Sequence, residues 1–360
     1  MRILHIAETI KGGVATYLEL LYSNVPHEHH FLIPASQAHE INIDRAHLTE
    51  FPGQGRLQRV LGLFGALSNI CHKHKYDIIH LHSSFAGYIF LLKNILRKNS
   101  PAVVFCAHGW SFQRQVSKAE RTICKIADYV TGRFSTGIIH ISKTEQAAAS
   151  FIPCSLQAPI YNPISNHYLS PLKKQNNQKT VKNILFVGRL DHQKGFDILY
   201  EAFKSKELEN FNLLVAGDAV LSGSNYKPTG NVNFLGWISK TSLIDLYENS
   251  DLTIIPSRWE GFGFVAIESL ARGTPVLSSR AGSLPEILGE YGQITEMRSA
   301  KEVIRAIIQY RTRAEEAPSI LQNYVRKNFS PELFSEKISE FYKKAVDKKT
   351  ASPHIEVQNK

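Results

Sequence analysis

The chain carries the same alternation of short apolar runs and helical stretches twice, and this repeat limits the possible folds more than any other feature. In the first half, the runs with strand-like length and composition lie at 2–7, 29–34, 77–82, 102–108 and 136–142. In the second half, they lie at 183–188, 212–217, 232–236, 251–257 and 274–279. Helical patterns separate them at 14–22, 86–98, 197–205, 240–250, 263–273 and 300–311. Apolar strands separated by helices predict parallel sheets covered on both faces, so we expect two doubly wound α/β domains.

The domain limits follow from where this pattern weakens. It fades near Pro153–Pro163 and gives way to polar residues, which favours an N-terminal domain at 1–165 and a linker at 166–181. The second domain is then 182–330. A last helix is expected at 331–348, packing back toward the N-terminal domain, before a disordered tail at 349–360. With 360 residues, the chain has the length of two ordinary domains.

The positive charge is concentrated in the first half. Residues 56–143 contain 13 Lys and Arg but three Asp and Glu, a net +10 that equals the formal charge of the whole chain. The first 165 residues also hold 12 of the 15 histidines. This asymmetry indicates an anionic partner for the N-terminal half: nucleic acid, phospholipid or a phosphorylated substrate.

One basic stripe gives that expectation a location. Arg114, Lys118, Arg121 and Lys125 follow one another at steps of four, three and four, which places them on one face of a helix. A second stretch at 56–75 begins with Arg56 and Arg59 and ends in a cationic cluster. Such stripes are often simply solvated helix faces, but two in one half fit a surface for anionic headgroups or diphosphates.

Composition favours a cytoplasmic location. No uncharged apolar run approaches the ~18 residues of a membrane span. The N-terminus lacks a signal-peptide pattern, and four cysteines without a CxxC spacing suit a reducing compartment.

The segment 260–276 carries the most specific pattern. Glu260 precedes Glu268 by eight residues, with Gly261 and Gly263 forming a glycine-rich turn that leads into a helix. Helix N-termini present unpaired N–H groups that suit phosphate. Glu268, about two turns into this helix, can accept hydrogen bonds from ribose hydroxyls, and Glu260 on the loop can meet sugar hydroxyls. Without further context these would be two surface carboxylates.

The segment 183–199 supplies that context. A strand ends at Gly188, and Arg189 and Lys194 follow on the loop before a helix that opens near Gly195. Two cations there can hold a diphosphate and neutralise the charge that develops as it leaves.

Together, in this order and spacing, the two segments resemble the retaining glycosyltransferases of family 4, which have the GT-B fold. The resemblance extends over most of the chain. It includes Gly12-Gly13 near the start, His108-Gly109 after a strand, Asn162-Pro163 and the stretch 281–288 around Glu286. It implies two Rossmann-like domains facing across a cleft, and a nucleotide-diphosphate sugar held mainly by the C-terminal domain.

The resemblance also implies roles for single residues. Arg189 and Lys194 match the diphosphate-binding pair, Glu260 the glutamate that contacts the donor sugar, and Glu268 the glutamate that contacts the ribose. His108 matches the histidine beside the donor sugar. The other expected donor contacts are Gly12 and Gly13 near the diphosphate, the N–H groups of Gly263, Phe264 and Val265, and Trp237 and Ile238 near the base. His80, His82 and His140 also end strand-like runs, and for them a buried structural role is the default.

The expected mechanism is a family-level inference. It retains configuration by front-face displacement, with the leaving phosphate helping to deprotonate the acceptor. The sequence has no D-x-D pair to hold a metal on the diphosphate, so Arg189 and Lys194 are expected to replace one and no cofactor is required.

The basic stripe makes a lipid-linked diphosphate or lipopolysaccharide acceptor at the inner face of the plasma membrane the favoured expectation, in polysaccharide assembly. UDP-linked hexoses or N-acetylhexosamines are preferred to GDP-linked mannose as donor.

Other classes remain open at this point. A GT-B phosphorylase or epimerase would share the fold, although no pyridoxal-phosphate lysine site is recognisable. A nucleic-acid-binding protein fits the charge but lacks a binding module, and a dehydrogenase lacks G-x-G-x-x-G. A non-catalytic sugar-sensing relative is disfavoured by the complete Arg, Lys, Glu and Glu set.

Overall fold

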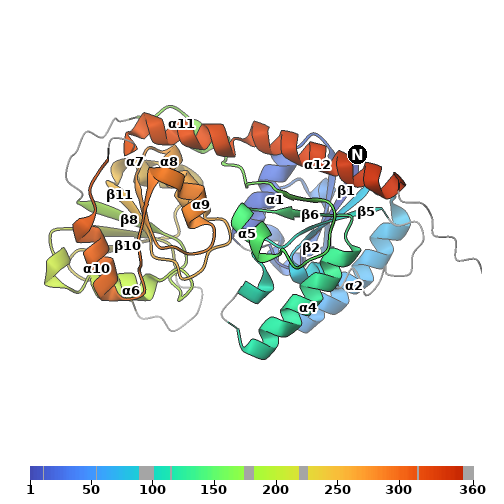
Figure 1. Cartoon of the computed structure of the whole chain (residues 1–360), viewed down its shortest axis with the longest axis horizontal. Coiled ribbons are helices and arrows are strands. Elements are labelled where there is room, and N and C mark those ends of the chain that lie inside the picture. Colours follow the sequence, from blue (N-terminus) through green and yellow to red (C-terminus); the bar gives the residue numbers. More distant parts are fainter. Residues whose placement is uncertain are drawn as a thin grey trace, which may run out of the picture. The chain divides into compact units, whose positions relative to one another are not determined.

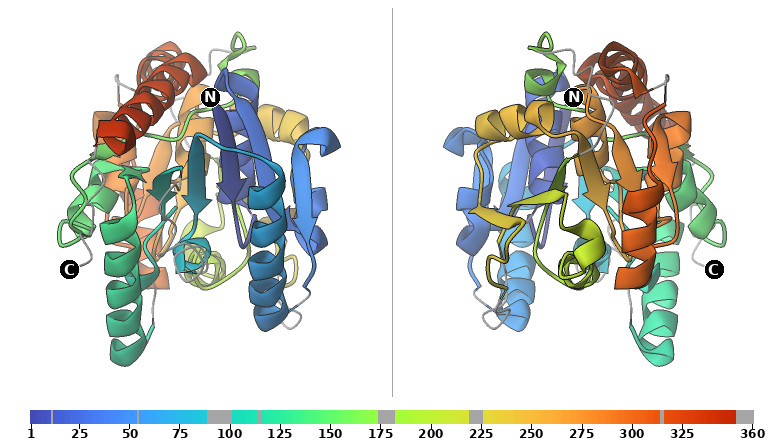
Figure 2. Two further views of the ribbon diagram at one scale, coloured as in Figure 1. Left: turned by 90° about the vertical axis from the view of Figure 1, so that its right-hand side faces the viewer. Right: turned by 90° about the vertical axis from the view of Figure 1, so that its left-hand side faces the viewer.

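The computed structural model describes residues 1–10, 12–53, 55–88, 101–113, 116–173, 182–218, 226–313 and 316–351. The chain forms two compact units. Unit 1 comprises Met1–Tyr161 together with Glu332–Lys360, and unit 2 comprises Asn162–Pro331. Each unit is a parallel sheet with helices on both faces, as Figure 1 and Figure 2 show. The predicted α/β class with two doubly wound, Rossmann-like domains is therefore confirmed.

Unit 1 contains a seven-stranded sheet in the order β3-β2-β1-β4-β5-β6-β7, with parallel pairing throughout. Its strands are β1 (Arg2–Ile6), β2 (Glu28–Pro34), β3 (Leu48–Phe51), β4 (Ile78–His82), β5 (Ala102–Cys106), β6 (Gly137–His140) and β7 (Gln157–Pro159). The strand order reverses between β1 and β4. Loops that follow these two strands therefore diverge and leave room for a ligand at the carboxyl edge.

The two faces of this sheet differ in character. One face packs Leu4, Ile6 and Phe105 into a hydrophobic core with residues of α2 (Arg56–Lys73). The other lies under α1 (Gly13–Asn24) and α12 (Pro331–Ala351), and it carries histidines as well as apolar side chains. Unit 1 also contains α4 (Lys118–Phe134) and α5 (Lys143–Ala148), with 3-10 turns η1 (Ala35–Glu40), η2 (Arg45–His47) and η3 (Ser111–Gln113).

Unit 2 contains a six-stranded parallel sheet in the order β10-β9-β8-β11-β12-β13. Its strands are β8 (Asn183–Val187), β9 (Asn212–Ala216), β10 (Val232–Gly236), β11 (Leu252–Ile255), β12 (Val276–Ser278) and β13 (Gly292–Ile294). Here the order reverses between β8 and β11, so the ligand position predicted by the topology lies beyond Val187 and Ile255.

Helices cover both faces of this second sheet. The helices are α6 (Phe196–Ala202), α7 (Lys240–Asn249), α8 (Phe264–Ala271), α9 (Leu284–Leu288), α10 (Ala300–Gln309) and α11 (Pro318–Phe329), and the 3-10 turns are η4 (Asn166–Leu169), η5 (Lys206–Leu208) and η6 (Gly289–Tyr291). α6 and α10 contribute to a core around Phe186 and Ile254. α8 packs against α11 over the opposite face.

The boundary between the units differs from the predicted one. It falls at Tyr161 instead of residue 165, and the start of the predicted linker belongs to unit 2. The reason is the buried Arg272, whose guanidinium donates to the carbonyl oxygens of Tyr168 (3.0 Å) and Ser170 (2.8 Å) and pairs with the buried Glu248. These bonds fix the polar segment to the domain. Residues 174–181 lie outside the described residues.

The last described helix of the chain is α12. α12 runs Pro331–Ala351, three residues beyond the predicted end, and from Glu332 on it belongs to unit 1. The disordered tail predicted beyond it falls largely on 352–360, outside the described residues, as does most of the helix predicted at 86–98.

Most of the elements missed by sequence reasoning are short. β3, β7 and β13 have three or four residues each, too few to show an alternation, and α9 has five. α11 was also missed, although Pro318 at its first position is a recognisable start signal.

Candidate functional site

The carboxyl ends of β8 and β11 bring two predicted site residues into direct contact. Lys194, on the loop after β8, donates from Nζ to both carboxylate oxygens of Glu260, at 3.0 and 2.7 Å, and Glu260 lies on the loop after β11. The side chains of Lys194 and Glu260 are 20% and 11% exposed. Ser257 donates to the same carboxylate at 3.2 Å. Lys194 and Glu260 are 66 positions apart in the sequence. They meet because β8 and β11 are neighbours at the point where the strand order reverses, which is the ligand position of the sheet.

Arg189 lies at the start of the same loop. Its Nη2 is 3.1 Å from Oδ2 of Asp191 and donates to Oε1 of Gln193 at 2.6 Å. The other oxygen of Asp191 accepts from the backbone N–H of Lys194 at 2.9 Å. Asp191 therefore joins the Arg189 guanidinium to the backbone of Lys194, a role that the sequence analysis did not assign.

A second set of contacts joins the loops after β8 and β11. Arg258 donates to both oxygens of Asp197 at 2.6 and 2.7 Å and to the carbonyl of His192. The backbone of Arg258 also donates to the carbonyl of Gln193 at 2.8 Å. A bidentate arginine holds planar geometry well, so these contacts keep the two loops in one arrangement. Sequence reasoning did not single out Arg258.

The glycine-rich turn before α8 is held in place by contacts with the segment 281–288. Gly263 is the N-cap of α8 at φ +95°, and a Cβ there would lie 2.7 Å from Leu284. Ser283 donates to the carbonyls of Gly261 and Phe262 at 2.7 and 2.8 Å. The segment 281–288, noted only as part of the resemblance, thus holds the turn that directs the N–H groups of α8. Phe264 and Val265, in the first turn of α8, are partly exposed.

Glu268 occupies the second turn of α8, as predicted. It is partly exposed, and its Oε2 accepts a hydrogen bond from the buried Tyr247 hydroxyl at 3.0 Å. Desolvation by the surrounding protein raises the pKa of Glu268 to about 7, against the opposing effects of Tyr247, Lys240 and Lys194. This carboxyl therefore changes charge near neutral pH.

Trp237 and Ile238 follow β10 at the same carboxyl edge of the sheet. Trp237 is 69% exposed, and Ile238 is partly exposed. An exposed indole is free to stack on a planar group, which leaves the predicted role near a nucleotide base as a proposal.

Unit 1 places its predicted residues at the equivalent edge. Gly12, at φ +62°, is the N-cap of α1, and Gly13 is the first helical residue. The loop before them is held by Gln37, whose Oε1 accepts from the backbone of Ile10 at 2.8 Å. Backbone N–H groups at the start of α1 therefore lie beyond the carboxyl end of β1.

His108 follows β5 in a strained conformation. Within the described residues, His108 (φ +54°) and Ser83 (φ +139°) are the non-glycine residues with positive φ, and they follow neighbouring strands β5 and β4. Glu145 anchors the next residue, because its carboxylate accepts from the N–H groups of Gly109 and Ile141, both at 2.6 Å. Strain held by such contacts is typical of functional positions, and Glu145 is a further residue that sequence reasoning missed.

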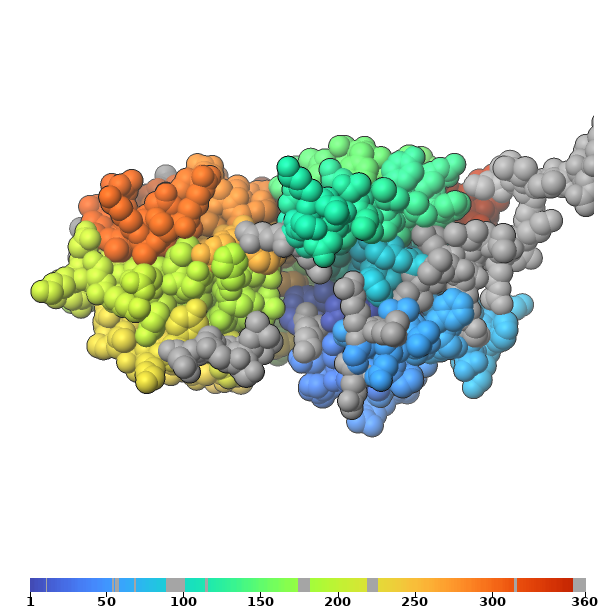
Figure 3. All heavy atoms as spheres, turned by 90° about the horizontal axis from the view of Figure 1, so that it is seen from below, coloured from blue at the N-terminus to red at the C-terminus, as the bar shows by residue number. Residues whose placement is uncertain are grey.

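The basic stripe lies on α4, which starts with a capping box between Ser117 and Glu120. Lys118, Arg121 and Lys125 are exposed, whereas Arg114 lies outside the described residues. Beside them the exposed apolar residues Ile123 (66%) and Ile126 (60%) form a second stripe. The blue-green surface in Figure 3 includes this helix. On α2, Arg59 lies 3.4 Å from Glu8 and forms an ion pair with it, so its charge is balanced within unit 1.

One side-chain cluster has the composition of a metal site. His5, His80 and His82 each place a ring nitrogen within 4.8 Å of the others, and all three are buried. A ring nitrogen of His5 already bonds one of His82 at 2.9 Å, so an ion would have to replace that hydrogen bond. In the part of the chain that the structure describes, no helix combines the length and hydrophobicity that a bilayer span requires.

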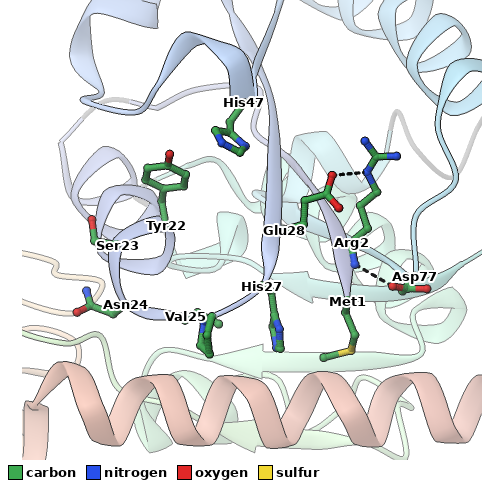
Figure 4. Close-up of a pocket in the computed structure, with 11 residues that line it drawn as sticks. Met1, Arg2, Tyr22, Ser23, Asn24, Val25, His27, Glu28, His47 and Asp77 are labelled. Atoms are coloured by element: carbon green, nitrogen blue, oxygen red, sulfur yellow. Dashed lines mark hydrogen bonds and ion pairs between the residues drawn. The ribbon is translucent and has the colours of Figure 1, made fainter.

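A hollow of about 920 Å³ lies in unit 1 away from these residues (Figure 4). Its lining includes Arg2, which pairs with Glu28 at 2.8 Å and donates from its backbone to Asp77 at 2.8 Å. Arg2 and Glu28 begin β1 and β2. The hollow is therefore at the amino edge of the sheet, the wrong edge for a ligand of a doubly wound fold.

Sequence and structure comparisons agree with the fold. The family described as "Glycosyltransferase Family 4" matches residues 11–150, and the family described as "Glycosyl transferases group 1" matches residues 171–328. A relative from Klebsiella pneumoniae, described as an uncharacterized 41.2 kDa protein in a cps region, is 33% identical over 319 residues, covering 84% of this chain and 88% of the relative. The chain therefore belongs to the group 1, family 4 glycosyltransferases and has their GT-B fold.

Two further matches extend this picture. The Escherichia coli enzyme named UDP-Gal:alpha-D-GlcNAc-diphosphoundecaprenol alpha-1,3-galactosyltransferase is 25% identical over 272 residues, 68% of each chain. The structure of HepE from Anabaena in complex with UDP-glucose superposes with a TM-score of 0.73 at 20% identity, covering 94% of this chain and 98% of that one. At that identity, the second match supports the fold.

Proposed function

We propose that the protein transfers a sugar from a UDP-sugar to a hydroxyl of a lipid-linked oligosaccharide or lipopolysaccharide acceptor, with retention of configuration, in polysaccharide assembly. The observation that carries the proposal is the Lys194–Glu260 pair at the carboxyl ends of β8 and β11. It is supported by the Escherichia coli relative, whose name specifies UDP-galactose and an undecaprenol-linked acceptor, and by the cps-region relative.

In this proposal each residue of unit 2 has a defined task. Arg189 and Lys194 bind the diphosphate and oppose the negative charge that grows on the leaving oxygen. Glu260, held by Lys194 and Ser257, accepts hydrogen bonds from sugar hydroxyls. Glu268 accepts from the ribose diol, and the N–H groups of Gly263, Phe264 and Val265 face phosphate. The leaving phosphate assists removal of the acceptor proton on the same face of the sugar.

The direct test is a donor screen that detects released nucleoside diphosphate. Purified protein is incubated with UDP-galactose, UDP-glucose, UDP-N-acetylglucosamine or GDP-mannose and a synthetic lipid-diphosphate acceptor. We expect acceptor-dependent UDP release and a product whose anomeric proton keeps the donor configuration. A product of inverted configuration would contradict retention, and absence of transfer from every UDP-sugar would contradict the donor class.

We further propose that transfer needs no metal, because Arg189 and Lys194 supply the positive charge at the diphosphate. The turnover rate in excess EDTA is expected to stay within about twofold of the untreated rate, since fixed cations need no ion to replace them. A metal-dependent glycosyltransferase assayed in the same EDTA concentration is the positive control for chelation. A loss of tenfold or more that Mg²⁺, Mn²⁺ or Zn²⁺ restores would overturn the proposal, and Zn²⁺ alone would direct attention to the buried histidines.

The pKa of Glu268 leads to a pH prediction for donor binding. The ionised carboxylate is the better acceptor for a diol, so binding of UDP-galactose, which has no group titrating near neutrality, should strengthen as pH rises through 7. Between pH 6 and 8 the dissociation constant measured by calorimetry is expected to fall about tenfold. Glu268→Gln should bind with a constant affinity over this range, and an equal pH dependence in that variant would refute the assignment.

The exposed surface of α4 supports peripheral docking at the cytoplasmic face of an anionic membrane. Its basic residues Lys118, Arg121 and Lys125 lie beside the apolar Ile123 and Ile126, and this combination is typical of helices that lie in a bilayer interface. The charge is complementary to acidic lipid headgroups, which add about 1 kcal/mol per Lys or Arg near the surface.

Vesicle sedimentation tests the docking surface. Charge reversal at Lys118, Arg121 and Lys125 should weaken binding to vesicles containing about one-third phosphatidylglycerol at least tenfold, and Ile123→Ser with Ile126→Ser should weaken it at any salt concentration. Reversal of the exposed Lys301 and Arg305 on α10 is the matched control. Unchanged binding of both α4 variants would exclude this helix as the docking surface.

A further inference from the structure

Four histidines of unit 1 form one continuous chain of hydrogen bonds that ends at His108. His29 Nδ1 bonds His5 Nε2 at 2.9 Å, His5 Nδ1 bonds His82 Nε2 at 2.9 Å, and His82 Nδ1 bonds His108 Nε2 at 3.0 Å. These residues come from β2, β1, β4 and the loop after β5, which are neighbours in that order in the sheet. The chain therefore crosses the sheet at right angles to its strands.

The far end of the chain fixes the direction of every bond. His29 Nε2 lies 2.9 Å from the carbonyl oxygen of Val25, which can only accept, so His29 must donate from Nε2. A neutral His29 then accepts at Nδ1, and His5 must donate from Nε2. The same argument passes to His82 and then to His108. All four neutral rings are thereby assigned the Nε2–H form, and Nδ1 of His108 is left as an acceptor.

The surroundings keep these rings neutral. His5, His29 and His82 are at most 2% exposed. The titratable side chains that face them include His27, His30, His47, His80, Tyr17 of α1, Tyr342 of α12 and Cys106 of β5, and none of these carries a negative charge at neutral pH that would favour an imidazolium. Cys106 Sγ, 3.8 Å from His108 Nδ1, is a weak thiol donor that a stronger donor can displace.

The four hydrogen-bonded histidines cannot pass a proton on to a final acceptor, so they support His108 and do not form a proton relay. A proton entering at His108 could move from ring to ring only as far as His29, where it would remain as a buried imidazolium, because the Val25 carbonyl does not accept a proton. Burial disfavours that charge and lowers the pKa of His29 to about 4. The hydrogen-bonded histidines are a static support that fixes the orientation and the tautomer of His108.

We propose that His82, supported by His5 and His29, is a positioning residue that holds His108 as the Nε2–H tautomer, so that Nδ1 accepts a hydrogen bond from a hydroxyl of the bound sugar. This rests on the proposed function and on the expectation from the family resemblance that His108 lies beside the donor sugar. It assigns to His108 the role of a neutral acceptor that neither gives nor takes a proton in the reaction. It also gives His82, for which burial alone was expected, a task in the site.

A pair of His82 substitutions separates positioning from packing. Asn places a carbonyl oxygen near the position of Nδ1 and can still accept from His108, whereas Leu fills the space without an acceptor. We expect His82→Leu to lower kcat for UDP-galactose transfer about 10–100-fold with a smaller change in KM, because a misplaced ring loses its alignment. His82→Asn should retain most of the rate. Equal losses in both variants, or none in either, would overturn the proposal.

His80→Leu is the matched control for loss of a buried histidine. His80 lies on the same strand and face as His82, is equally buried, and bonds Tyr342 instead of the chain. It should lower thermal stability by a similar amount and leave kcat unchanged. A kcat loss in His80→Leu equal to that in His82→Leu would show that packing alone matters.

Nitrogen-15 NMR of histidine-labelled protein tests the chain without any activity. We expect His5, His29, His82 and His108 as Nε2–H tautomers at pH 7.5, and His108 in a mixture of tautomers in His82→Leu. An Nδ1–H tautomer for His108 in the wild-type protein would refute the proposal even if transfer occurs. Correct tautomers in a protein without transferase activity would instead leave the chain established and the proposed function wrong.

Discussion

Replacing Lys194 by Met is expected to lower kcat for sugar transfer about 10²–10³-fold while the fold is retained. Lys194 is one of two cations at the ligand position of unit 2, and removal of one preorganised group that stabilises developing charge typically costs this much. Lys204→Met is the control, since this half-exposed lysine lies after α6 in the same unit and pairs with Glu201. Its rate should be unchanged.

The contact with Glu260 requires one more variant. Lys194→Met also leaves Glu260, 11% exposed, without its cation, so a lost rate could reflect an unpaired carboxylate instead of lost catalysis. In Lys194→Met with Glu260→Gln, no unpaired charge remains. We expect the double variant to be at least as slow as Lys194→Met alone. Recovery to near the wild-type rate would mean that Lys194 serves only to neutralise Glu260.

Unit 1 is expected to lose stability steeply below pH 6. Burial lowers the pKa of His29 to about 4 and of His108 to about 3, and it lowers the pKa of His5, His80 and His82 well below 6.5. These rings stay neutral in the folded state, whereas the unfolded chain takes up protons near pH 6.5. Their contribution is therefore complete above that pH and is lost as pH falls below it.

One carboxyl acts in the opposite direction. Burial raises the pKa of Glu145 to about 7, so the folded state holds a proton that the unfolded chain releases above about pH 4.5. With five histidines and this one carboxyl, the unfolded state binds about four more protons, and the free energy of unfolding should fall by about 5 kcal/mol per pH unit below pH 6. Since domains are stable by about 5–15 kcal/mol, unit 1 should unfold between pH 4 and 6.

Tryptophan fluorescence can follow unit 1 alone. Trp110 is buried in unit 1, while Trp237 and Trp259 belong to unit 2, so Trp237→Phe with Trp259→Phe leaves one reporter. Urea unfolding at pH 7.5, 6.5 and 5.5 then gives the change in the free energy of unfolding per pH unit. A free energy independent of pH over this range would show that the histidines are not held neutral. In His80→Leu, the free energy of unfolding should depend less steeply on pH, because one of the five histidines is missing.

The residues that belong to local sequence motifs could be predicted from the sequence. The repeated strand and helix runs predicted two Rossmann-like domains, and the spacing of Arg189, Lys194, Glu260 and Glu268 placed them on two loops and a helix start, where the structure has them. Short edge strands such as β7 were not accessible, because three residues carry no period.

The supporting contacts needed coordinates. Arg258, Ser283 and Glu145 were not singled out, because nothing in their local sequence indicates partners 22 to 66 residues away. Asp191 contacts residues of its own loop, and it was missed because its carboxylate carries no motif of its own. A signal did exist for the histidine chain: His80 and His82 occupy alternate positions in one strand-like run, and His5 and His29 lie in two others. Without the strand order, however, His82 could be assigned only to the core.

The sequence by itself determined the class of fold, the family and the identity of the charged groups, because periodicity and loop motifs are local properties of the chain. Only the tertiary structure decided which groups meet. The reversal of strand order brings Lys194 to Glu260, and the adjacency of β2, β1, β4 and β5 aligns four imidazoles. Contacts between parallel strands depend on how the sheet is ordered, and that order is set by packing over the whole domain.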